Sequence, residues 1–64
     1  MLKKHGEYYQ FIVFEDKEHE WVYEIYSLGA KPLLIVESDE WFESEGEAGL
    51  AAIGHISLLE NGEG

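Results

Sequence analysis

The chain has 64 residues, no cysteine and a formal net charge of −10, from fourteen carboxylates against four lysines. This composition excludes disulfides and thiolate metal sites, and the charge argues against direct contact with nucleic acid or an anionic membrane, whose phosphates would repel it. A domain this small buries only about 60% of its unfolded surface, so we expect oligomerisation to add stability.

Polar residues near the amino terminus favour a cytoplasmic protein. Glu7, Gln10, Glu15 and Asp16 interrupt the apolar run that a signal peptide needs. No stretch approaches the ~20 apolar residues of a membrane-spanning helix. We expect a single domain over residues 1–64, with loose ends at 1–6 and 61–64.

The first predicted strand covers residues 8–14, which are almost all aromatic or β-branched. Its odd-numbered side chains are assigned to the core, because Gln10 marks the other face as the wetter one. The charged segment 15–20 contains no glycine, so we expect a hairpin loop of several residues rather than a tight turn.

The central strand is predicted over 21–28, where aromatic and β-branched residues alternate and the odd-numbered ones face the core. Gly29 allows the chain to turn. A third strand begins at Pro32 or Leu33 and ends at Glu37, with its even- and odd-numbered side chains on opposite faces.

A helix is predicted over 45–60, after an aromatic loop at 38–42 that is expected to close one end of the core. Ser44 followed by Glu47 forms a capping box that starts the helix. The fold class is therefore α+β: a three-stranded antiparallel β-meander followed by one C-terminal α-helix packed on one sheet face. The helix face assigned to the sheet consists of Ala48, Ala52, Ile53, Ile56 and Leu59.

Several short segments follow a recognisable pattern in addition to the order of the elements: 11–13, 21–25, 38–42, Ser44, Ala48 and 52–56. In these segments and in the order β-β-β-α, the chain resembles the YegP-like family of small bacterial proteins of unknown function. It departs from the family pattern at Trp41 and at 43–45, where a glycine before the loop aromatic and lysines after it are usual. The resemblance implies a dimer, because family members occur as tandem or paired repeats, and it implies no reaction.

No arrangement of residues predicts catalysis, a cofactor or a metal. His5, His19 and His55 lack the spacing of a zinc site, and His55 is placed at the edge of the apolar helix face. Fourteen carboxylates leave an acid–base pair open, but a small meander with one helix has little room for a pocket. We therefore expect a protein that is not an enzyme.

One functional hypothesis is a small binding or regulatory module that acts as a homodimer. The first strand would be an unprotected sheet edge, and the second sheet face would remain apolar. A stripe of Leu50, Gly54 and Leu58 offers a further contact on the helix, or only two scattered exposed leucines. The candidate interface residues are Tyr8, Ile12, Phe14, Val22, Tyr26, Leu34, Val36, Leu50 and Leu58.

The alternative hypothesis is an acidic nucleic-acid mimic that blocks a DNA- or RNA-binding protein, which makes a basic protein the partner. A mimic needs its carboxylates gathered in a line or stripe, whereas simple solubility needs only scatter. The candidate acidic patch consists of Glu37, Asp39, Glu40, Glu43, Glu45 and Glu47.

Overall fold

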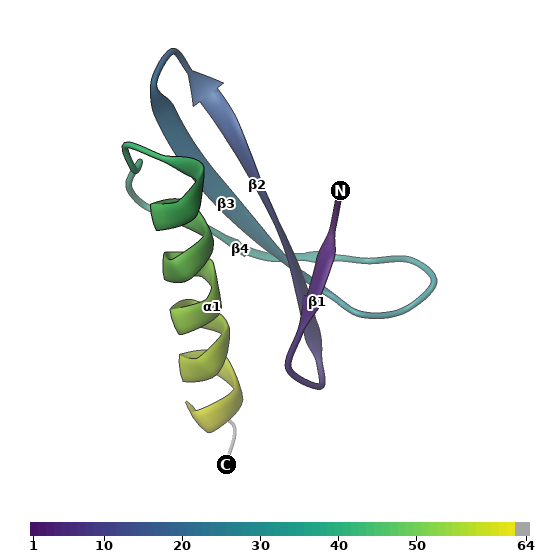
Figure 1. The fold of residues 1–64 in the computed structure, drawn as a ribbon. Helices are drawn as coiled ribbons and strands as arrows, with labels where there is room; N and C mark the ends of the chain where they lie inside the picture. The colour runs from purple at the N-terminus through teal and green to yellow at the C-terminus, as the bar shows by residue number, and fades with distance from the viewer. Residues whose placement is uncertain (63–64) are drawn as a thin grey trace.

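A computed structural model of the chain describes residues 1–62, which form one antiparallel sheet and one helix. The sheet order is β1-β2-β3-β4, and α1 lies along one face of it against β2 and β3 (Figure 1). The α+β class with a carboxy-terminal helix is confirmed, but the sheet has four strands where three were predicted. The elements are β1 (Lys3–His5), β2 (Tyr9–Lys17), β3 (Glu20–Ser27), β4 (Leu34–Glu37) and α1 (Glu45–Gly62).

The additional strand, β1, lies in the segment 1–6 that was expected to be loose. It pairs with the first part of β2, from His5 opposite Tyr9 to Lys3 opposite Phe11. Its sequence is short and basic and has no apolar alternation, so sequence reasoning missed it. The prediction that the whole first strand is a free edge is therefore wrong, because β2 lies between β1 and β3 over this part.

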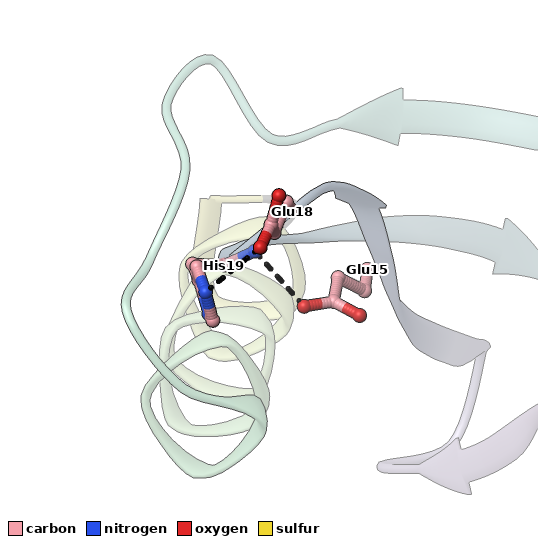
Figure 2. A network of polar contacts seen from close by, with 3 residues as sticks. All are labelled: Glu15, Glu18 and His19. Atoms are coloured by element: carbon pink, nitrogen blue, oxygen red, sulfur yellow. Dashed lines mark hydrogen bonds and ion pairs between the residues drawn. The ribbon is translucent and has the colours of Figure 1, made fainter.

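The β2–β3 hairpin closes with two residues rather than with the longer loop that was predicted. Lys17 pairs with Glu20, and His19 adopts a φ of 65°, a left-handed conformation in which histidine is enriched among non-glycine residues. A register shift between Glu15 and Lys17 accommodates this turn. Figure 2 shows the backbone N–H of His19 donating to Glu15 Oε2 at 3.0 Å, which holds the turn closed.

A β-bulge at Ile35 changes which side chains of β4 point to each face of the sheet. Val36 pairs with Ile25, but Leu34 pairs with Tyr26, so Ile35 is the extra residue. Val36 therefore faces the core and packs against it, whereas Leu34 faces the other side. The expectation that these two side chains share one face is wrong, because simple alternation cannot reveal a bulge.

The core lies between α1 and the odd-numbered side chains of β2 and β3, as predicted. Phe11 and Ile25 from the sheet meet Ala52 and Ile56 from the helix. The small alanines allow the helix backbone to approach the sheet closely. Of the two loop aromatics, Phe42 packs against this core, but the neighbouring tryptophan is exposed. The buried residues are Phe11, Tyr23, Ile25, Ala48, Ala52 and Ile56.

Both ends of α1 are held by specific contacts. Ser44 caps the first turn as predicted, since the N–H of Glu47 donates to Ser44 Oγ at 3.2 Å. At the other end the helix continues to Gly62, into the segment 61–64 that was expected to be loose, of which 63–64 lie outside the described residues. There Glu60 Oε2 accepts the N–H of Glu7 at 2.8 Å, and its carboxyl group lies against Gly6. The end of the helix is thereby attached to the β1–β2 turn.

This attachment predicts that Gly6→Ala destabilises the fold. The residue has a φ of +78°, which costs an L-residue about 1–2 kcal/mol, and the new methyl group would meet the Glu60 carboxyl. Gly54→Ala is the matched control, because it lies in an exposed part of the helix with open space around it and should gain up to ~1 kcal/mol. Urea denaturation measures both changes, and equal stability of the two variants would contradict the expectation.

Candidate functional site

The sheet face turned away from α1 carries five apolar side chains outside the core, of which Leu34 is exposed and the other four are half-buried. The ladders place Phe14 beside Val22, and Tyr26 beside Leu34, which is 50% exposed. Within residues 1–62, no element packs on this face. We call it the open face, and its residues are Ile12, Phe14, Val22, Tyr26 and Leu34.

A small acidic depression interrupts the open face between Val22 and Tyr26. Glu24 lies opposite Ile12 on one side and opposite Glu37 on the other. The hydroxyl of Tyr26 donates to Glu24 Oε1 at 2.8 Å, and this bond raises the pKa of Tyr26. The depression has a volume of about 220 Å³ and is lined by Phe14, Asp16, Val22, Tyr23, Glu24, Glu37 and Ser38.

The structure brings together five of the nine interface residues that the sequence suggested. Val36 belongs to the core, and Tyr8 lies exposed in the β1–β2 turn. Leu50, 72% exposed, and Leu58 lie on the outer side of α1, away from the open face. The two leucines therefore do not extend the sheet surface, and their stripe is a separate feature of the helix.

Two exposed apolar residues at the sheet edge were not among the predicted interface residues. Leu33, 67% exposed, and Ile35 flank Leu34 at the start of β4. Their signal in the sequence was an uninterrupted apolar run, but strict alternation assigned them to a covered face. The bulge leaves them exposed, and they extend the apolar surface from the open face to the outer edge of the sheet.

The acidic residues gather at one end of the molecule. Glu37 lies apart from the other predicted acids, on β4 opposite Glu24, and the rest fall within 39–47. A bridge between Trp21 and Phe42, with N–H···O distances of 2.9 and 2.8 Å, joins this segment to β3 next to the β2–β3 turn. We define the acidic end as 15–20 together with 39–47, which hold nine carboxylates against one lysine, a charge of −8.

A tyrosine–histidine pair is the other polar feature near the core. The Tyr23 hydroxyl lies 2.8 Å from Nδ1 of His55, and the ring of Phe42 stacks on the tyrosine with 6.1 Å between centroids. Burial raises the pKa of Tyr23, and the negative charges of Asp39 and Glu40 raise it further. The pair joins β3 to α1 beside the core, since Tyr23 lies on the strand and His55 on the helix.

The described residues form neither a metal site nor a helix that could span a membrane. Across 1–62, no three histidine, aspartate or glutamate side chains are grouped so that they could hold an ion. The described helix is not apolar enough over the required length to cross a bilayer. The carboxylates that gather at the acidic end are therefore considered below as a charged surface.

The raised pKa of Tyr23 predicts a loss of stability in alkaline solution. The unfolded tyrosine releases its proton near pH 10, whereas the folded one retains it, so this contribution is present below about pH 10 and is lost as pH rises through the folded pKa. Tyr23→Phe should cost about 1 kcal/mol at neutral pH, through the lost bond to His55, and should flatten the alkaline decline. Urea titrations at several alkaline pH values test this, and an unchanged slope in the variant would contradict it.

Three comparisons, with protein families, with curated proteins and with solved structures, find no match to this chain.

Proposed function

We propose that the chain is a binding module without catalytic activity that associates with a second copy of itself through the open face. The observation that carries this proposal is the apolar, uncovered surface opposite α1 within residues 1–62. Fully burying an exposed large apolar side chain is worth about 1.5–3 kcal/mol. Covering the open face would bring part of this for each of its residues, because Leu34 is 50% exposed and the other four are already half-buried.

The distribution of charge favours this face over the other surfaces for self-association. Two copies carry −10 each and repel one another, and salt screens that repulsion. Most of the charge is concentrated at the acidic end, so a two-fold arrangement of open faces that turns the acidic ends apart reduces the repulsion. The resemblance to the YegP-like family implies a dimer but does not indicate which surface forms it.

The dimer predicts a mass of twice 7.3 kDa in light scattering at micromolar concentration, with tighter association as salt rises. Leu34→Lys should weaken the dimer by about 10- to 100-fold, because it places a charge in the buried face. The matched control is Leu50→Lys, the same change at an exposed leucine on the helix. A monomer at every salt concentration, or equal effects of the two variants, would refute the proposal.

A second candidate function is mimicry of nucleic acid by the acidic end. The observation that favours it is the concentration of −8 of the total −10 in two adjoining segments. Carboxylates gathered in this way attract a basic surface that otherwise binds phosphates. The same molecule could self-associate and act as a mimic, because the open face and the acidic end are defined by different residues.

Mimicry predicts that the protein displaces fluorescent duplex DNA from protamine, a basic DNA-binding protein, and that added salt weakens the displacement. Asp39→Asn with Glu43→Gln should weaken it more than Glu7→Gln with Glu37→Gln, which removes the same charge outside the acidic end. Fluorescence anisotropy measures the release. Equal losses in the two double variants would assign the effect to net charge alone and would count against mimicry.

A further inference from the structure

A groove of about 440 Å³ lies between the outer edge of β2 and the first turns of α1. Phe11, Val13 and Ile53 form its apolar floor. The helix contributes Gly46 and Gly49 to the lining beside Glu45 and Ile53, and no atom lies within 4 Å of the position that a Cβ at Gly49 would take. The groove therefore has room for side chains from another chain. It is lined by Met1, Lys3, Phe11, Val13, Glu45, Gly46, Gly49 and Ile53.

An unpaired stretch of strand borders this groove. β1 pairs with β2 only as far as Phe11, so β2 has no paired strand on that side from residue 12 onward within the described chain, and of the residues before β1 only Met1 reaches the groove. The carbonyl of Tyr8 accepts a bond from Leu28, which shows that the even-numbered backbone groups point toward the β3 side. By this alternation, the N–H and C=O groups of Val13 and Glu15 point outward, where they can pair with an added strand.

The charges along the groove differ between its two ends. Lys3 stands at the end next to β1. At the other end are Glu45 on the helix and Glu15, which follows Val13 on the same side of β2. An extended segment antiparallel to β2 would bring its amino-terminal side to these carboxylates and its carboxy-terminal side to the lysine. This pattern complements a segment that is basic at its beginning.

We propose that the groove binds an extended peptide that joins β2 as an antiparallel strand, with alternate apolar side chains in the groove and basic residues at its amino-terminal end. Strand addition of this kind combines main-chain hydrogen bonds with pockets for every second side chain. A second copy of this chain is a poorer occupant, because it would bring the acidic hairpins of both copies together. The groove lies on the α1 side of the sheet, so the proposal does not depend on association through the open face.

The test uses the synthetic peptide Lys-Lys-Val-Thr-Val-Thr-Val with a free carboxylate, titrated into the full chain by calorimetry. We expect saturable binding that Gly49→Leu weakens by at least about ten-fold, since the leucine fills the groove. Gly54→Leu is the matched control, because it makes the same change at a helical glycine outside the groove and should leave binding unchanged. Hydrogen exchange of the Val13 and Glu15 amides should slow on binding.

Four results would overturn the proposal: no saturable binding, equal weakening by the two leucine variants, unaltered exchange of the Val13 and Glu15 amides, or equal affinity for the reversed peptide Val-Thr-Val-Thr-Val-Lys-Lys. A Gly49→Leu variant that loses self-association without any peptide would assign the groove to a second copy instead. If the dimer experiment with Leu34→Lys fails, this test still stands. Leu34 lies on the sheet face turned away from α1, whereas Gly49 lies in α1 on the other side of the sheet.

Discussion

The packing of a single helix against a single face of the sheet is the constraint on which the other surfaces depend. Ala52 and Ile56 meet Ile25 where all three side chains are fully buried, and this contact fixes which side of each strand is inside. One helix cannot cover both faces of a four-stranded sheet. The same contact that builds the core therefore leaves the opposite face apolar and uncovered in the described chain, and this is the surface assigned to self-association.

A backbone bridge gathers much of the charge of the molecule at one end. The bridge between Trp21 and Phe42 holds the segment before α1 against β3 next to the β2–β3 turn, which places the acids of both at one end. The charges that remain on the apolar surfaces are few: Glu24 and Glu37 on the open face, and Lys3 and Glu45 in the groove. A protein of −10 can in this way remain dispersed in solution and still present apolar patches of limited size.

The sequence was sufficient wherever a regular period governs the structure. Alternation identified Phe11, Tyr23 and Ile25 as core residues, and helical spacing with the Ser44 cap identified the buried side of α1. It was insufficient where one residue breaks the period or where no period exists. The bulge at Ile35, the left-handed His19 and the basic strand β1 are of this kind, since backbone pairing, rather than side-chain pattern, determines each of them. Because of the bulge, Val36 packs on the core and is not part of the predicted interface. The groove beside β2 was not predicted either, because it depends on where the pairing with β1 ends.

The bond between Glu60 and the β1–β2 turn has a consequence for the order in which the chain folds. It joins groups 53 residues apart in sequence, so it can form only after the intervening hairpin and helix have brought the two ends together. β1 has only three residues and pairs with β2 through a short local turn, so its pairing does not depend on closing this long loop. With so few contacts it should open early in local unfolding, and the bond from Glu60 to the turn limits that opening. While β1 is detached, the outer edge of β2 is free from Tyr9 onward, and the accessible strand is longer than in the fully closed fold.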